Sequence, residues 1–249
     1  MQNYSEAGLI LIGDELLCGK RRDSHFDHVL ETLAATGRNL AWTYMVGDDR
    51  QRLTRVLRQS MAEPLPVFCF GGIGATPDDV TRQCAAQAAD QALIRHPQAV
   101  AEIEARFGEA AYPNRILMAE LPASSTIIPN PINRIPGFSV GHHHFFPGFP
   151  NMAWPMLDWV LGQYYSEAVT PLQELATGVF DVPETDLVNM LESLTRAYPG
   201  VKIFSLPSVT PRRYIELGVR GRQGVDEAFN ALLDALTAAG IAYEPPQRG

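Results

Sequence analysis

The stretch from Val67 to Thr81 constrains the fold most, because a short apolar run there meets a cluster of glycines and then two adjacent carboxylates. Residues 67–70 (VFCF) are too few for a helix and are bounded by breakers, so they predict a buried strand. Gly71, Gly72 and Gly74 allow positive φ and leave no side chain in the way of a ligand. The stretch therefore predicts a strand, a glycine turn and a helix.

The start of this helix, expected from about Asp79 to Ala89, suggests the chemistry of a ligand. Asp79 or Thr76 can cap it, and Pro77 suits its first turn. Unpaired amides at a helix start favour a phosphate or an acidic group. Asp78 and Asp79 fit such a site if a divalent cation lies between them and the phosphates, because hard cations take oxygen ligands. A structural turn with Asp as a cap explains the same residues.

Strands alternate with helices of about a dozen residues over the first part of the chain. Residues 7–13 and 40–46 predict strands, and residues 24–36 predict a helix that Ser24 caps and whose apolar face is Phe26, Val29, Leu30 and Leu33. This alternation indicates βαβ units and a mainly parallel sheet. Ligands of such sheets bind outside the carboxyl ends of the strands, where the loops after the first and third strands meet.

The loop after the first strand, residues 14–23, has an unusual composition. Gly13 is followed by the acidic pair Asp14 and Glu15, and then by three consecutive bases at residues 20–22. We expect Gly13, Asp14 and Glu15 to face the same ligand as the glycine turn. The bases could offset charge on a leaving phosphate, although such a run is more often a solvated loop.

The next segments combine helices, proline loops and three histidines. Residues 97–107 predict a helix, residues 127–128 a short strand within a proline-fixed path, and residues 152–164 a helix with Met156, Trp159 and Val160 inward. Residues 142–144 are consecutive histidines on a predicted strand, where adjacent side chains point to opposite faces. Only the first and third could share a metal, and solvent-exposed rings are the favoured interpretation.

From residue 166 onward the pattern predicts a separate, smaller unit in which helices cover one side of a sheet. Its expected strands are residues 168–172, 201–206, 214–219 and 241–243, and its expected helices begin at residues 183 and 224. We therefore divide the chain into residues 1–165 and residues 166–249.

The composition limits the partners. The formal net charge is −8, which argues against a general nucleic-acid surface. The three cysteines include no CxxC pair, so neither a disulfide framework nor a zinc knuckle is indicated. No signal peptide and no apolar run long enough to span a bilayer are present, so a cytoplasmic protein without a membrane partner is expected.

With these residues in view, the chain resembles the amino-terminal part of the competence/damage-inducible protein A (CinA-like) family, within the molybdopterin-binding (MoaB/Mog-like) domain superfamily. Four segments carry the resemblance: residues 12–19, residues 46–49, residues 70–81, and the proline loops at residues 129–138 and 146–150. The resemblance covers the first 165 residues strongly, and the remainder is similar, more weakly, to the KH-like domain that follows in that family.

The resemblance implies a three-layer α/β/α domain with a mainly parallel sheet, followed by a small α+β KH-like domain, in a homo-oligomer such as a dimer or trimer. It implies a phosphate-bearing ligand, either molybdopterin or an ADP-ribose-type or FAD-type nucleotide that is hydrolysed with a divalent metal such as Mg²⁺. The expected ligand residues are Gly13, Asp14, Glu15, Gly71, Gly72, Gly74, Thr76, Asn130, Pro147 and Gly148.

Two functions stay open at this point. In the first, the protein is a metal-dependent nucleotide pyrophosphatase in which Asp78 and Asp79 are catalytic and, with Asp14, hold the metal. In the second, the same pocket binds molybdopterin without turnover, in molybdenum cofactor metabolism. A nucleic-acid role is disfavoured by the charge, although residues 218–221 (GVRG) match the GXXG spacing of a KH module near a strand end.

Overall fold

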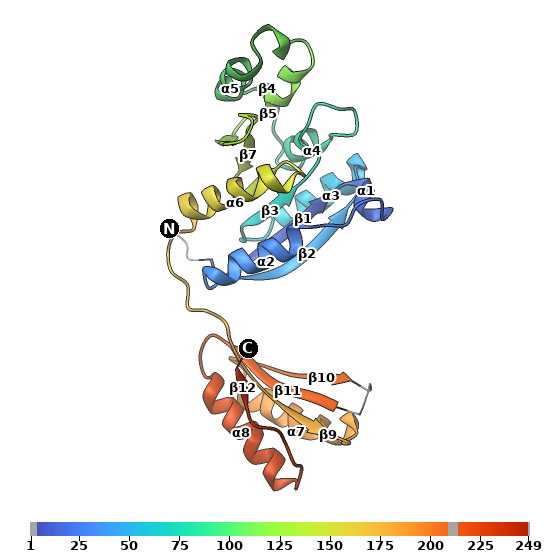
Figure 1. The fold of residues 1–249 in the computed structure, drawn as a ribbon, viewed down its shortest axis with the longest axis vertical. Coiled ribbons are helices and arrows are strands. Elements are labelled where there is room, and N and C mark those ends of the chain that lie inside the picture. Colours follow the sequence, from blue (N-terminus) through green and yellow to red (C-terminus); the bar gives the residue numbers. More distant parts are fainter. Residues whose placement is uncertain (1–3, 209–213, 249) are drawn as a thin grey trace. The chain divides into compact units, whose positions relative to one another are not determined.

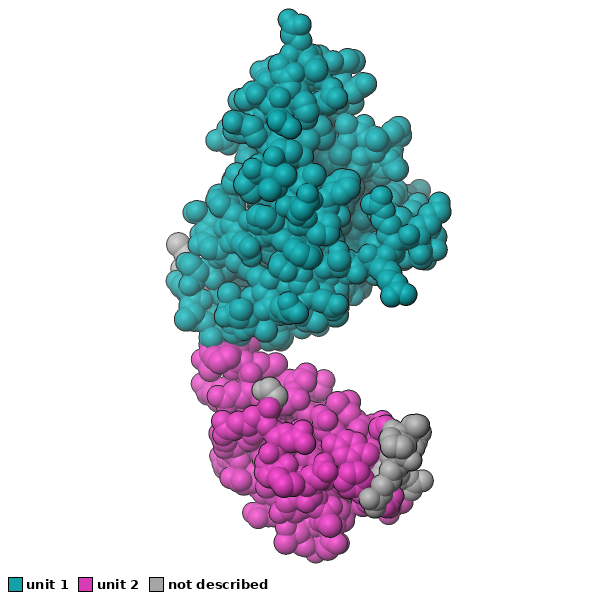
Figure 2. All heavy atoms as spheres, in the orientation of Figure 1, with its two compact units in different colours: residues 1–169 teal, residues 170–249 magenta. Residues whose placement is uncertain are grey.

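The computed structural model describes residues 4–208 and 214–248. The chain forms two compact units, Met1–Val169 and Thr170–Gly249 (Figure 2). The boundary lies after residue 169, four residues beyond the division drawn from the sequence. Each unit has its own apolar core, and we describe them separately.

A six-stranded sheet in the order β2-β1-β3-β8-β7-β6 forms the centre of the first unit. β1, β2, β3 and β8 pair in parallel, and the two remaining strands add antiparallel pairs at one edge. The strands are β1 (Glu6–Ile12), β2 (Asn39–Val46), β3 (Val67–Phe70), β6 (Thr126–Ile128), β7 (Gly137–Val140) and β8 (His143–Phe146). The prediction of an α/β unit with a mainly parallel sheet is confirmed.

Helices cover both faces of this sheet (Figure 1). Along β1, Leu9 and Leu11 pack with one helical layer, whereas Ile10 and Ile12 pack with the other. This period of two on a strand buried from both sides explains its continuous apolar run. The first layer contains α2 (His25–Ala35) and α6 (Pro150–Tyr164), and the second contains α3 (Arg50–Met61), α4 (Thr81–Ala88) and α5 (Pro97–Phe107).

A small lobe joins the sheet beside α4. It contains α5, two short 3₁₀ helices and a two-stranded antiparallel sheet (Figure 1). Its elements outside α5 are β4 (Leu93–Arg95), η1 (Gly108–Ala111), η2 (Arg115–Ala119) and β5 (Glu120–Pro122).

Some local predictions for the first unit are wrong. The expected loop after β1 contains the short helix α1 (Asp14–Leu17). Ser24 does not cap α2, because the carboxylate of Asp23 instead accepts hydrogen bonds from the amides of His25 and Phe26. On the predicted apolar face of α2, Phe26 is 39% exposed and Leu30 37%, and the buried residues are His25, Val29 and Leu33. On α6, Trp159 is 36% exposed although it was expected to point inward.

The prediction of solvent-exposed histidine rings holds for His142 but is wrong for the two histidines that follow it. His143 and His144 are each 2% exposed, because each ring finds a hydroxyl partner inside the protein. Nε2 of His143 donates to Oγ of Ser60 (2.8 Å), whose own proton goes to a backbone carbonyl. The ring of His144 lies between the hydroxyls of Ser139 and Tyr165, both at 2.8 Å. A buried polar ring is tolerated when its nitrogens are hydrogen-bonded.

The second unit is a four-stranded antiparallel sheet in the order β10-β11-β9-β12, with two helices packed on it. The strands are β9 (Gln173–Phe180), β10 (Lys202–Ser208), β11 (Tyr214–Gly221) and β12 (Gln247–Arg248), and the helices are α7 (Glu184–Ala197) and α8 (Val225–Ala238). The α+β character and both helices agree with the prediction.

Two strand predictions in this unit are wrong. Residues 168–172 are not a strand, because Pro171 has no amide to donate; the strand lies at β9 instead. Gly178 weakens the strand pattern of β9 in the sequence. The position requires glycine, because a Cβ there would lie 2.3 Å from a ring atom of Tyr214. Residues 241–243 contribute only an isolated bridge between Val179 and Tyr243.

The GXXG match at residues 218–221 lies inside β11 and pairs with strands on both sides, so it is not an open loop.

Within the described part of the chain, no helix has the length and apolar character needed to cross a bilayer.

The buried histidines predict that the protein loses stability in acid. Burial lowers the pKa of His143 to about 4 and that of His144 to about 3, from 6.5. The unfolded chain therefore binds protons that the folded chain excludes, so stability is full above about pH 6.5 and falls as the pH drops toward these lowered values. Urea unfolding between about pH 8 and about pH 5 should show a slope of up to ~1.4 kcal/mol per pH unit for each histidine.

The control for this prediction is His142, which is exposed. His144→Gln should flatten the pH dependence of the unfolding free energy by about the contribution of one histidine, whereas His142→Gln should leave it unchanged. Equal slopes in the two variants would contradict the assignment.

Candidate functional site

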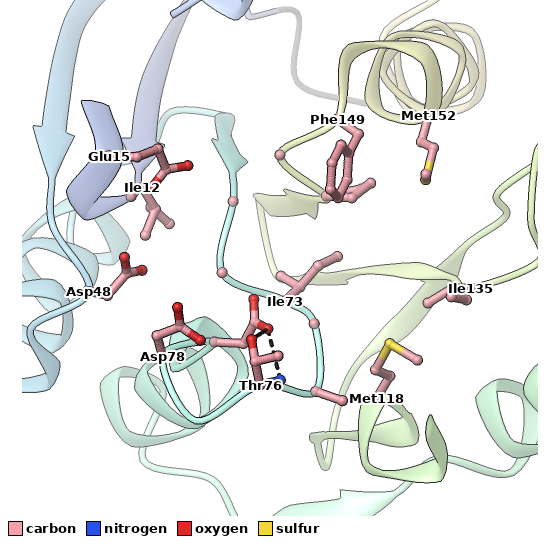
Figure 3. Close-up of a pocket in the computed structure, with 18 of the residues that line it drawn as sticks. Ile12, Glu15, Asp48, Ile73, Thr76, Asp78, Met118, Ile135, Phe149 and Met152 are labelled. Atoms are coloured by element: carbon pink, nitrogen blue, oxygen red, sulfur yellow. Dashed lines mark hydrogen bonds between the residues drawn. The ribbon is translucent and has the colours of Figure 1, made fainter. Parts of the chain in front are cut away.

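A pocket of about 590 Å³ opens where the parallel strands of the first unit end (Figure 3). Its walls come from the residues that follow β1, β2, β3, β6 and β8, together with η2 and the start of α6. All the predicted site residues except Asp14 line it, namely Gly13, Glu15, Gly71, Gly72, Gly74, Thr76, Asp78, Asp79, Asn130, Pro147 and Gly148. The sheet topology thus gathers residues that are far apart in the sequence.

The glycine turn begins with a close backbone approach that only glycine permits. Gly71 has φ of +110°, and a Cβ there would lie 2.1 Å from the carbonyl oxygen of Ile12. Its amide donates to the carbonyl of Phe146 at 3.0 Å. Gly71 therefore ties the ends of β1, β3 and β8 together at the floor of the pocket.

Side chains from α4 and from the turn itself hold the rest of the turn. Oγ1 of Thr81 donates to the carbonyl of Gly71 (3.0 Å). Asp79 accepts from the amide of Thr76 (2.9 Å) and also from the hydroxyl of that residue. The capping prediction for Asp79 and Thr76 is therefore wrong, since the two close the turn on each other and α4 begins after Val80 without a side-chain cap.

Arg82 is a buried support that the sequence did not reveal. It is 3% exposed, and its guanidinium donates to the carbonyls of Gly74 (2.7 Å), Glu120 (3.2 Å) and Leu117. Burial lowers its pKa, and the nearby charges of Glu120 and Asp79 oppose that shift. A single arginine in a helical pattern is typical of a solvated face, so no sequence signal distinguished it.

One side of the pocket is acidic. Glu15 on α1, Asp48 after β2 and Asp78 in the turn after β3 point into it (Figure 3). Burial raises the pKa of Asp48, and the charges of Asp14, Glu15 and Asp78 raise it further, while a backbone hydrogen bond from Asp14 opposes them. Hydrogen bonding by Thr76 lowers the pKa of the exposed Asp78. This side therefore concentrates negative charge that a cation would relieve.

The sequence missed Asp48 as a site residue and proposed Asp14 in its place. Asp14 does not line the pocket. Its amide donates to Oδ2 of Asp48 (2.9 Å), and its Oδ1 accepts from the amide of Asp48 (3.2 Å). Asp14 thus holds Asp48 in position. The available signal was the position of Asp48 directly after a parallel strand that ends at the same edge.

The opposite side of the pocket is apolar. Met118, Ile135, Phe149 and Met152 lie there, and Ile73 lies on the turn between the two sides (Figure 3). Phe149 is 54% exposed, so its ring is accessible to a ligand. The sequence did not single out these residues, because they come from loops, a 3₁₀ helix and the first turn of α6, where apolar side chains form no periodic pattern.

Two polar residues hold the loops of the apolar side. Asn130 is 5% exposed; its amide donates to the carbonyl of Ile135 (3.0 Å) and its oxygen accepts from the amide of Ile132 (3.0 Å). Asn130 therefore lines the pocket while its side chain shapes the loop. His25 accepts a hydrogen bond from Nε1 of Trp154 at Nδ1 (3.3 Å), so its Nε2 donates to the carbonyl of Gly148 (3.2 Å).

The acidic side fits a divalent cation of the kind that shares its ligands with a phosphate. Within residues 4–208 and 214–248, no three His, Cys, Asp or Glu side chains converge as a cage for a metal. Mg²⁺ is commonly held by one or two carboxylates, with water and substrate phosphates completing the shell. Asp48 and Asp78 offer such a pair, whereas Asp79 is engaged by Thr76.

Comparisons with known proteins identify the family of this chain. Residues 8–166 match the family described as a probable molybdopterin binding domain. A CinA-like protein from Geotalea uraniireducens is 30% identical over 240 residues, which cover 92% of this chain and 56% of that protein. A CinA-like protein from Geobacter metallireducens is 30% identical over 216 residues, which cover 80% of this chain and 50% of that protein. The chain thus spans about half the length of the curated relatives it matches.

A solved structure shows the same likeness. The crystal structure of CinA, of unknown function, from Thermoplasma acidophilum superposes with a TM-score of 0.59 and 28% identity, over 65% of this chain and 98% of that chain. This chain therefore belongs to the family defined by the probable molybdopterin binding domain and is a CinA-like member of it. The resemblance proposed from the sequence is confirmed.

The contact at Gly71 generates a prediction about stability. Gly71→Ala should destabilise the protein by more than about 2 kcal/mol, because the new Cβ would meet the carbonyl of Ile12 and the residue would keep a positive φ. Gly19→Ala is the matched control, since Gly19 has φ of +72° but nothing within 4 Å of its Cβ position. Urea unfolding measures both variants, and equal losses would contradict a steric role for the Ile12 contact.

Proposed function

We propose that this chain binds a small molecule that combines phosphate with a planar heterocycle, a nucleotide diphosphate or a phosphorylated pterin, and that it hydrolyses a nucleotide pyrophosphate of the ADP-ribose or FAD type with a divalent metal. The observation that carries the proposal is the division of the pocket. Carboxylates line one side, apolar side chains line the other, and the glycine turn lies between them (Figure 3).

The glycine turn suits the phosphates. The backbone of residues 72–74 borders the pocket and leaves room for an anion to approach closely. Carboxylates around a bare phosphate would repel it, so the acidic side favours a metal-bound phosphate. Arg21 also lines the pocket and can offset charge on the leaving phosphate.

The metal in this proposal would be held by Asp48 and Asp78. When bound, a divalent ion such as Mg²⁺ neutralises phosphate charge and lowers the pKa of a bound water. The protein's own residues do the positioning: Asp14 orients Asp48, and Thr76 with Asp79 closes the turn. Phe149 and Met152 contact the heterocycle and exclude water from it.

A second candidate function uses the same pocket without turnover. The family match is to a probable molybdopterin binding domain, and this favours a pterin phosphate as ligand in molybdenum cofactor metabolism. Such a protein needs the glycine turn and the apolar side but not the metal carboxylates.

We also propose that the chain works as a homo-oligomer, a dimer or trimer, and that the second unit is KH-like.

The hydrolysis proposal is tested with purified protein and ADP-ribose or FAD, with and without Mg²⁺, Mn²⁺ or Co²⁺. Release of AMP should require a metal, and Asp78→Ala and Asp48→Asn should each lower kcat by about 100-fold or more. Asp234→Asn, on the exposed face of α8 in the second unit, is the control and should keep full activity. If the unaltered protein shows no turnover with any of the metals, the binding-only function is favoured.

The apolar side is tested separately. Phe149→Ala should weaken binding of the nucleotide about tenfold and leave the metal requirement unchanged, because stacking of a base on an aromatic ring contributes about 1–3 kcal/mol. Calorimetric titration of the Kd measures the effect. Phe26→Ala, which removes a comparably exposed ring outside the pocket, is the control. Unchanged affinity in Phe149→Ala would show that the heterocycle lies elsewhere.

A further inference from the structure

The helix α3 has a charge pattern that the glycine-turn pocket does not explain. It carries four arginines and no acidic residue, in a chain whose formal net charge is −8. Arg50 and Arg52 lie in its first turn, where the helix dipole disfavours cations. Departures from local electrostatic preference tend to occur at functional sites.

Among the described residues, three of these four arginines have no acidic partner. Elsewhere in the chain, Arg134 pairs with Glu102 and Arg220 with Glu174. Of the α3 arginines, only Arg58 has an ion pair within the described ranges, to Asp90 at 3.4 Å across an exposed surface. Arg50, Arg52 and Arg55 form none with the described residues. The positive charge of these three arginines is therefore not neutralised by an ion pair with the described residues, and it is available to bind an anion.

Three of the arginines line one groove. A hollow of about 580 Å³ lies along α3 and reaches α4, bordered by Arg50, Thr54, Arg55, Arg58, Gln59 and Gln87. The guanidinium of Arg58 donates to the carbonyl of Gln87 (3.0 Å), and Thr54 donates to the side chain of Gln87 (3.3 Å), so α4 braces one wall. The lining is rich in hydrogen-bond donors and contains no carboxylate.

This groove is separate from the pocket described above. No residue that lines the groove also lines the glycine-turn pocket. The two also differ in sign, since carboxylates border the pocket and guanidiniums border the groove. A ligand that binds the groove therefore needs negative charge of its own and no metal.

We propose that the α3 groove is a second phosphate-binding site that takes a short polyphosphate chain, as in inorganic tripolyphosphate or the tail of a nucleoside triphosphate. One guanidinium group can bind two phosphate oxygens at once, and three guanidinium groups suit a chain with several phosphates. Arg50 and Arg58 are eight residues apart, about 12 Å along the helix, so the long side chains of the three arginines can converge on a short chain. The acidic remainder of the protein repels a long polyanion such as nucleic acid.

The test is calorimetric titration of the whole chain with tripolyphosphate at low salt and without metal. The unaltered protein should bind it, and Arg55→Gln should weaken binding about tenfold. Arg52→Gln is the matched control, because it removes the same charge from the same helix outside the groove. Circular dichroism establishes that both variants are folded. Asp78→Ala should bind tripolyphosphate normally, which separates this site from the proposed hydrolytic one.

The possible outcomes are distinct. Absence of binding, equal weakening by Arg52→Gln and Arg55→Gln, or loss of binding in Asp78→Ala would each overturn the second site. Tighter binding of a single-stranded oligonucleotide than of tripolyphosphate would overturn it in favour of a nucleic-acid surface. Titration with ATP identifies the source of the phosphates, because equal affinity indicates recognition of the phosphate chain alone and tighter binding indicates a nucleotide.

Discussion

The contact between Gly71 and the carbonyl of Ile12 is the constraint on which the pocket depends. β3 has only four residues, all buried, and it lies between β1 and β8 in parallel register. Parallel pairing brings the loops after these strands to one edge of the sheet, and the absence of a side chain at Gly71 lets the first two of them touch. The hydrogen bond from Gly71 to Phe146 adds the third loop. The polar and apolar walls of the pocket follow from which residues these loops carry.

Neighbouring acids at the pocket have different roles, even though the sequence presents them together. Asp14 and Asp79 lie next to Glu15 and Asp78, yet their carboxylates are occupied by backbone amides of other residues. An adjacent pair of acids at a tight turn therefore divides into one group that faces the pocket and one that holds the turn. Beside the turn, the buried guanidinium of Arg82 donates to backbone carbonyls.

The parallel sheet and its helices could be predicted from the sequence, because the periodicities of strands and helices are local patterns. The place of the pocket could be predicted too, because ligands of a parallel sheet bind outside the carboxyl ends of its strands. The features that were predicted wrongly depend on contacts between segments far apart in the sequence. His143 and His144 are buried only because Ser60, Ser139 and Tyr165 supply hydroxyls, and no spacing reveals such partners. β9 was missed because Gly178 weakens its strand signal, and Tyr214 uses the space. Asp48 could have been predicted as a site residue, because it follows the carboxyl end of β2 just as the predicted residues follow β1 and β3.

The bonds that hold the glycine turn are all made within the chain. Thr81 holds Gly71, Arg82 holds Gly74, and Thr76 is bonded to Asp79, so none of these bonds waits for a ligand. A molecule that enters the pocket therefore meets a backbone whose conformational entropy was lost when the protein folded. Association then costs mainly the ligand's own freedom, so even a small ligand can reach useful affinity with few contacts.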